Sequence, residues 1–138
     1  MTPPDRSFAL PLRVYYEDTD AGGVVYYANY LRYLERARTE VLRALGFEQA
    51  ELARDEGIAF AVRSLQAEYL RPARLDDLVE VISRIGELGR AQVVFHQRVE
   101  RQGELLLEAT VRVACLDMAK GKAAAIPKRI HDKFKELT

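Results

Sequence analysis

The feature that most constrains the fold is a single long amphipathic segment near the middle of the first half of the chain. Its apolar residues recur three or four positions apart, at Tyr30, Leu34, Ala37, Val41 and Leu45. This spacing predicts a long helix, with Asn29 as a candidate N-cap, although the helix could begin a few residues earlier, and with Gly46 as a natural C-terminal stop. A lone long helix can bury such a stripe only against a sheet that curls around it.

The rest of the chain favours that sheet. Alternating or apolar runs predict strands over residues 8–16, 60–69, 78–88, 91–101 and 104–117. Tight turns are expected between Gly86 and Gly89 and at Gln102-Gly103, and short helices over 48–56 and 128–137. We therefore predict an α+β fold in which a long central helix is wrapped by an antiparallel β-sheet, in one domain over residues 1–138. The open edges of such a sheet favour a dimer.

Composition excludes several classes of function. The 21 basic residues balance 21 acidic ones, which argues against bulk electrostatic binding to nucleic acid or an acidic membrane. The single cysteine, Cys115, excludes an internal disulfide and suits a reducing compartment. We find no signal-peptide pattern, no membrane-spanning run and no Cys/His set with zinc spacing. The expectation is a cytoplasmic protein without a metal.

A short acidic loop precedes the predicted helix. Asp18 and Asp20 are followed by Gly22-Gly23, and the helical pattern begins soon afterwards. A carboxylate beside the unpaired N–H groups of a helix N-terminus can attack, or activate water against, a polarised carbonyl. Taken alone, a loop aspartate is more often a cap or turn residue. We expect Asp18 to be structural, bonded to loop N–H groups.

Three segments carry a family resemblance. Residues 15–37 read YYEDTDAGGVVYYANYLRYLERA and resemble the signature of the 4-hydroxybenzoyl-CoA thioesterase family, most closely the acyl-CoA thioesterases associated with the bacterial Tol-Pal system. Residues 68–77 (EYLRPARLDD) and 125–128 (AIPK) resemble the same subfamily. The resemblance implies a hotdog fold, a dimer with active sites at its interface that often assembles into a homotetramer, and hydrolysis of an acyl-CoA thioester without any cofactor.

The resemblance also assigns roles within the acidic loop. The catalytic aspartate of the family corresponds to Asp20, and Tyr27 stands where the closer subfamily usually has a histidine. The substitution is tolerable if this position contributes its backbone N–H. The N–H groups of Tyr27 and Ala28 would then polarise the thioester carbonyl, while Asp20 acts as nucleophile or general base. Because a thiolate leaves readily, no strong general acid is needed.

Other candidate residues are cations for the phosphates of CoA and an acid on the helix. Arg63 and Arg90 are the expected substrate-binding residues, and Arg90 follows a turn where the family often has basic CoA contacts. Further surface candidates are Arg71, Arg74, Lys120, Lys122, Lys128 and Arg129. The late lysine-rich stretch is an alternative docking site for an acyl carrier protein. Glu35 is expected in a buried or interface ion pair with an arginine.

Two alternative functions stay open from the sequence. One is a non-catalytic module that binds acyl-CoA or acyl carrier protein, or scaffolds envelope proteins; Asp20 argues against it, since a binder has little need of a carboxylate at the carbonyl. The other is a dehydratase, which would pair a histidine with an acid. His96 is predicted to be exposed, and neither it nor His131 forms a convincing triad with Cys115.

Overall fold

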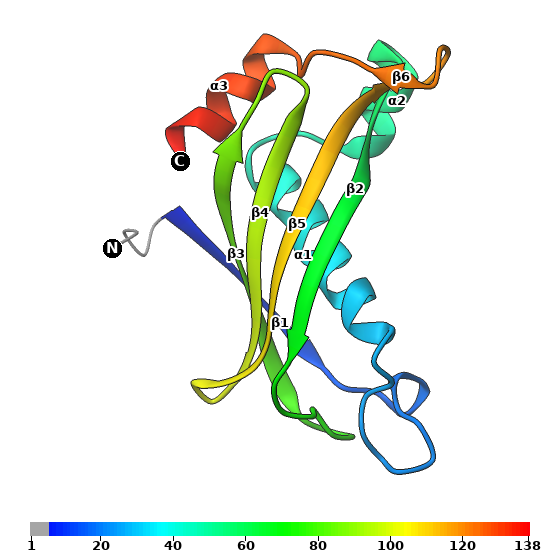
Figure 1. Cartoon of the computed structure of the whole chain (residues 1–138), viewed down its shortest axis with the longest axis vertical. Helices are drawn as coiled ribbons and strands as arrows, with labels where there is room; N and C mark the ends of the chain where they lie inside the picture. The colour runs from blue at the N-terminus through cyan, green and yellow to red at the C-terminus, as the bar shows by residue number, and fades with distance from the viewer. Residues whose placement is uncertain (1–5) are drawn as a thin grey trace.

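The computed structural model describes residues 6–138 and places one long helix against a curved antiparallel sheet (Figure 1). The strands are β1 Ser7–Arg13, β2 Ile58–Tyr69, β3 Leu78–Leu88, β4 Gln92–Arg101, β5 Glu104–Asp117 and β6 Lys122–Ala123. The helices are α1 Asn29–Ala44, α2 Gln49–Glu56 and α3 Lys128–Glu136, with a 3-10 turn at Tyr16–Asp18. The predicted α+β class and the helix wrapped by a sheet are confirmed, and this is the hotdog arrangement.

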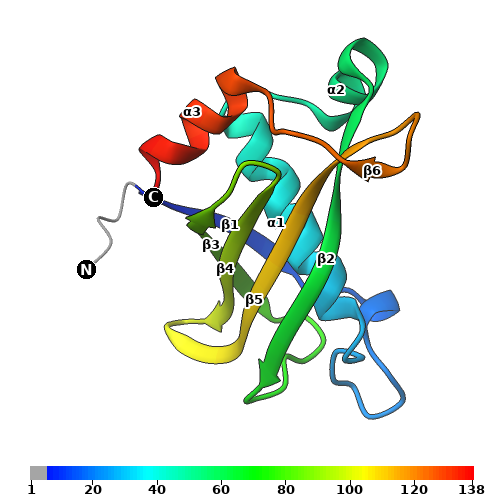
Figure 2. The same cartoon turned by 45° about the horizontal axis from the view of Figure 1, so that its top comes forward.

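The sheet has the order β1-β3-β4-β5-β2, with every neighbouring pair antiparallel and β6 added to β5. Its edges are therefore β1 and β2 in the part of the chain that the structure describes. Strand β1 is short and carries Pro11, which suits an edge. Strand β2 has 12 residues and presents the longer open edge. Figure 2 shows the twist that lets the sheet curl around α1.

The core lies between α1 and the inner face of the sheet. Helix α1 buries a continuous apolar stripe formed by Tyr30, Tyr33, Leu34, Ala37, Val41 and Leu42. Full burial of a side chain such as Leu34 contributes about 1.5–3 kcal/mol. Helix α3 closes one end, where the ring of Phe134 packs edge-on against Phe60 and Phe95 at centroid distances of 6.2 and 6.5 Å.

One polar network crosses this core. The buried Gln97 donates from Nε2 to the Leu34 carbonyl (3.0 Å) and to Ser83 Oγ (2.9 Å). Its Oε1 accepts a hydrogen bond from Arg38 at 3.0 Å. Burial lowers the pKa of Arg38, and the nearby Glu35 carboxylate opposes that shift. Because an unpaired buried amide would cost about 1–3 kcal/mol, these bonds fix the register between α1, β3 and β4.

Two predicted boundaries at the acidic loop are wrong. Strand β1 ends at Arg13 rather than at residue 16, because the next residue, Val14, bonds outside the ladder to Asp76 and Asp77. Asn29 is the first helical residue and Ala28 is the N-cap, so the Asn29 cap is wrong and the helix begins one residue earlier, as the alternative allowed. The Asn29 side chain reaches back to the acidic loop instead of capping its own helix.

The predicted turn between Gly86 and Gly89 is also displaced. Gly86 lies inside β3, and the turn follows Leu88, closed by the Gly89 N–H bonding to the Gln92 carbonyl at 2.8 Å. A Cβ built on Gly86 would come within 2.4 Å of the His96 ring. This glycine therefore serves the packing of the neighbouring strand rather than a turn.

Candidate active site

The loop around Asp20 is held by its own backbone. The Asp20 N–H bonds to the Val24 carbonyl (2.9 Å), and the Asp20 carbonyl accepts the Gly23 N–H (3.0 Å). Its Oδ1 accepts the Gly22 N–H at 2.8 Å. Gly23 has φ +77°, a conformation that favours glycine. Within residues 6–138 the Oδ2 atom of Asp20 makes no hydrogen bond, so an exposed carboxylate oxygen is left available on a fixed loop.

Asp18 ties this loop to the start of α1, as expected of a structural residue. Its Oδ2 accepts the Tyr15 N–H at 2.9 Å. Its carbonyl accepts both the Tyr26 N–H and the Asn29 side-chain amide at 2.9 Å. Burial, together with the nearby Asp18 carboxylate, raises the pKa of Tyr33. Loop and helix tip therefore form one connected unit.

Two adjacent peptide groups at the helix tip are oriented by their carbonyls. The Tyr26 carbonyl accepts the Asn29 N–H at 2.8 Å, and the Tyr27 carbonyl accepts the Tyr69 hydroxyl at 3.2 Å. In a trans peptide the N–H points away from the preceding C=O. The N–H groups of Tyr27 and Ala28 belong to these two peptides and bond to nothing in the described part of the chain. The helix tip thus offers two free N–H donors, the kind of group that stabilises an oxyanion in other enzymes.

Aromatic rings surround these donors. Tyr26 and Tyr27 are exposed, the latter by 62%, whereas Tyr30 and Tyr33 belong to the core. The Tyr69 ring meets Tyr27 and Tyr30 edge-on at 6.3 and 5.6 Å. Sequence reasoning missed the role of Tyr69, although it lies in one of the family-like segments. Its contact joins residues 42 positions apart and depends on the curvature of β2.

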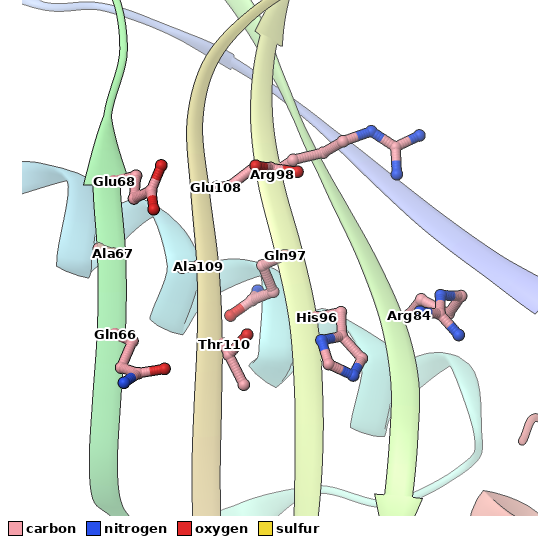
Figure 3. A pocket seen from close by; sticks show the side chains of 10 residues that line it. All are labelled: Gln66, Ala67, Glu68, Arg84, His96, Gln97, Arg98, Glu108, Ala109 and Thr110. Carbon is pink, nitrogen blue, oxygen red and sulfur yellow. The ribbon is translucent and has the colours of Figure 1, made fainter.

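One hollow of the single chain, of about 690 Å³, lies beside the acidic loop and is lined by Arg13, Val14, Tyr15, Tyr16, Glu17, Leu75 and Asp76. A second hollow of about 690 Å³ is on the outer face of the sheet, opposite α1 (Figure 3). It is lined by Gln66, Ala67, Glu68, Arg84, His96, Gln97, Arg98, Glu108, Ala109 and Thr110. His96 is half-buried there, not exposed as predicted, because its ring lies against Gly86. Because this hollow lies on the face of the sheet away from α1 and its lining includes neither Asp20 nor Tyr27, we do not assign it to catalysis.

A smaller hollow of about 240 Å³ lies between α1 and the sheet. Phe60, Phe95 and Phe134 contribute apolar surface, and Glu35 and Arg38 contribute charge. Glu35 is exposed and makes no ion pair within the described residues, so the buried alternative is wrong and the interface alternative stays a prediction. None of these three hollows includes Asp20 or Tyr27 among the residues described as lining it.

The predicted cations are not brought to Asp20 within one chain. Arg63 is exposed on β2, and Arg90 is exposed in the β3–β4 turn, at the opposite end of the sheet from the acidic loop (Figure 1). Arg129 bonds to Glu56, and Lys128 pairs with Asp132 at 2.9 Å. Over residues 6–138, no cluster of three His, Cys, Asp or Glu side chains could hold a metal ion.

No helix in the described structure combines the length and the apolar character needed to cross a membrane. Cys115 is buried, and burial raises the pKa of its thiol. It therefore behaves as a core residue, as its place in the strand pattern predicted.

The fold places the protein among hotdog proteins, and comparison with known proteins identifies the family. The chain belongs to the thioesterase superfamily, whose model matches residues 22–108. It is accordingly a thioester hydrolase. The matched range includes Tyr27 and Ala28 and begins just after Asp20.

Relatives of known name and structure agree with this family. The chain is 48% identical over 133 residues to the acyl-CoA thioesterase YbgC of Haemophilus influenzae, covering 96% of this chain and 98% of that protein. It is 50% identical over 130 residues to the acyl-CoA thioester hydrolase YbgC of Escherichia coli O6:H1, covering 94% and 96%. A probable thioesterase from Bartonella henselae is 36% identical, with a TM-score of 0.84 over 88% of this chain and 99% of that one. A hypothetical protein from Thermus thermophilus is 34% identical, with a TM-score of 0.88 over 96% and 98%.

Proposed function

We propose that the protein hydrolyses acyl-CoA thioesters, with Asp20 acting on a carbonyl held by the N–H groups of Tyr27 and Ala28. The observation that carries the proposal is the pair of free, oriented peptide donors beside a loop whose carboxylate has one unengaged oxygen. The names of the Haemophilus and Escherichia relatives support acyl-CoA as the substrate.

The chemistry follows from charge development at the carbonyl oxygen. As the carbonyl carbon becomes tetrahedral, its oxygen gains negative charge and binds the two N–H groups more strongly. Removing one such donor in other enzymes costs about 3–4 kcal/mol of transition-state stabilisation. The positive end of the helix dipole acts in the same direction. The C–S bond then breaks, and CoA leaves as a thiolate.

Asp20 has two routes to the same products. As a nucleophile, its carboxylate oxygen bonds to the acyl carbon and forms a mixed anhydride, which water then cleaves to the free acid and the original carboxylate. As a general base, it takes a proton from a water molecule while that water attacks the carbon. Both routes need an ionised carboxylate and consume one water per thioester.

Tyr27 contributes its main chain in this account. Its side chain is exposed, while its carbonyl is fixed by Tyr69, so the peptide it shares with Ala28 is oriented without any help from a histidine. A Tyr27→His variant should therefore change rate or selectivity only modestly. We further propose that Tyr69 positions this donor peptide.

Dimerisation through the open edge of β2 would complete the site. An antiparallel pairing of two β2 strands places the end of one copy that carries Arg90 beside the Asp20 end of the other. Exposed apolar side chains near this edge, Val62 and Tyr69, favour its burial. Arg63, in the middle of β2, and Arg90 are then suitably placed cations for CoA phosphates. Light scattering tests this dimer, or a tetramer built from it; a monomer at assay concentration would contradict it.

The decisive experiment is thiol release over a panel of acyl-CoA thioesters. Asp20→Asn should lower turnover at least about tenfold, which corresponds to about 1.4 kcal/mol of barrier. Glu17→Gln is the matched control, because Glu17 is an exposed acid of the same loop. Full turnover by Asp20→Asn would remove the aspartate from the mechanism. No turnover of any CoA or acyl-carrier-protein thioester would instead favour the non-catalytic binding module.

The finer physiological assignments rest on the resemblance alone. Association with the Tol-Pal system, a cytoplasmic location and action on acyl carrier protein stay predictions. The ion pairs of Lys128 and Arg129 leave Lys120 and Lys122 as the candidates for an acidic partner in the late lysine-rich stretch.

A further inference from the structure

The segment 70–77, which the sequence marks as family-like, forms the support behind the Asp20 loop. The Val25 N–H bonds to the Ala73 carbonyl at 2.8 Å, and the Leu75 N–H bonds to the Gly23 carbonyl at 3.1 Å. These bonds flank an antiparallel bridge between Val24 and Arg74. Since the Val24 carbonyl also accepts the Asp20 N–H, the position of this segment is transmitted directly to the proposed catalytic residue.

A charged pair holds the turn of this segment. Asp77 Oδ2 accepts the Arg74 N–H at 2.8 Å and the Arg101 guanidinium at 2.7 Å. Arg101 also donates to the Pro72 carbonyl at 3.3 Å and pairs with Glu104. The Arg101 guanidinium thus bonds to the segment at two points and connects it to the β4–β5 hairpin.

The pair is partly shielded from solvent. The side chains of Asp77 and Arg101 are only 23% and 27% exposed. Burial raises the pKa of Asp77. The hydrogen bonds from Arg74 and Arg101, together with the charges of both arginines, lower it more, so the pKa of this carboxyl lies below its usual value. The carboxylate is ionised at neutral pH, and its bonds are charge-assisted.

We propose that Asp77 and Arg101 are positioning residues for catalysis, holding the turn at 72–77 so that the Asp20 loop presents its carboxylate to the helix tip. This role rests on the function proposed for Asp20. Other contacts already fasten the segment to the core: Ala73 is buried, its N–H bonds to the Tyr30 hydroxyl at 2.9 Å, and Val14 bonds to Asp76 and Asp77. The pair therefore sets the geometry of the turn more than it sets whether the protein folds.

The first test compares two arginines of the same strand. Arg101→Gln and Asp77→Asn should each lower kcat about tenfold and leave KM within about twofold. Arg98→Gln is the matched control, because Arg98 lies on β4, is 46% exposed and pairs with Glu100 without touching the 70–77 segment. It should change kcat by less than about twofold.

The second test asks whether the effect passes through Asp20. In an Asp20→Asn background, Arg101→Gln should cost less than about twofold in the residual rate, since the two changes act on one unit. Hydrogen exchange provides a readout independent of activity. In Arg101→Gln, the Val25 and Leu75 amides should exchange faster, while amides in the middle of α1 keep their protection.

The outcomes separate this role from the proposed function. An Arg101→Gln enzyme that matches Arg98→Gln in kcat, or that loses the same factor in both backgrounds, would overturn the positioning role alone. Unchanged exchange at Val25 and Leu75 would overturn it too. An Asp20→Asn enzyme with full turnover would remove the proposed catalytic role of Asp20, and the positioning role with it.

Discussion

The hydroxyl of Tyr69 offers the sharpest test of how the donor peptide is oriented. Tyr69→Phe keeps the ring, and so its edge-on contacts with Tyr27 and Tyr30, and removes only the bond to the Tyr27 carbonyl. A neutral hydrogen bond contributes about 0.5–1.5 kcal/mol net. At 3.2 Å and on a half-exposed side chain we take the lower part of this range, about 0.5–1 kcal/mol, which predicts a kcat about two- to fivefold lower.

The assay is steady-state thiol release with a short-chain acyl-CoA, accompanied by thermal unfolding. Tyr16→Phe is the control, because Tyr16 is the most exposed of the large side chains near the loop and its hydroxyl bonds to nothing in the described chain. Tyr30→Phe should act mainly on stability rather than on kcat. It strands the buried Ala73 N–H, so it should cost about 1–3 kcal/mol of unfolding free energy.

A clear result would refute this reasoning. If Tyr69→Phe keeps the native kcat while its melting temperature falls, the tyrosine contributes packing and the Tyr27–Ala28 peptide needs no external support. If Tyr16→Phe loses as much rate as Tyr69→Phe, the effect is not specific to the bond.

Two further predictions concern stability. Gly86→Ala should destabilise the fold by about 1–3 kcal/mol, because the new methyl group would meet the His96 ring at 2.4 Å. In thermal unfolding, adding His96→Ala should restore most of this loss. A Gly86→Ala protein as stable as the native one would contradict the proposed contact between position 86 and His96. Asp77 has a folded pKa below its unfolded value of about 3.9, so its stabilisation is complete above that pH and is lost as the pH falls through the folded pKa. Urea unfolding between about pH 6 and pH 2 should therefore show that acidification lowers the unfolding free energy of Asp77→Asn less than that of the native protein. If the unfolding free energies of the two proteins fall in parallel with pH, the assignment is contradicted.

Much of the fold follows from local sequence patterns. The apolar spacing from Tyr30 to Leu45 predicts α1, and alternation predicts the strands close to their observed bounds. The architecture follows because one helical stripe needs one curved sheet, whereas the strand order β1-β3-β4-β5-β2 was not predicted. The predicted boundaries were wrong where a residue bonds outside its own element, as Val14 does at the end of β1.

The site was only partly predictable, for a physical reason. Asp20, Tyr27 and Ala28 are close in sequence, so a motif can place them together. The Tyr69–Tyr27 and Arg101–Asp77 bonds join residues 42 and 24 positions apart, and their partners are chosen by sheet curvature and turn geometry. No spacing rule gives such pairs. Arg90 shows the converse: it was predicted for the site, but the β3–β4 turn that carries it lies at the far end of the chain's own sheet (Figure 1).

The central claim is that the thioester carbonyl rests on two peptide N–H groups with the residue at position 20 facing its carbon. A crystal structure of Asp20→Asn with a non-hydrolysable acyl-CoA analogue measures this directly. The account predicts the carbonyl oxygen about 3 Å from the nitrogens of Tyr27 and Ala28, with the position-20 side chain against the acyl carbon. An analogue bound with its carbonyl turned away from the start of α1, or lodged in the outer-face hollow beside His96, would contradict it.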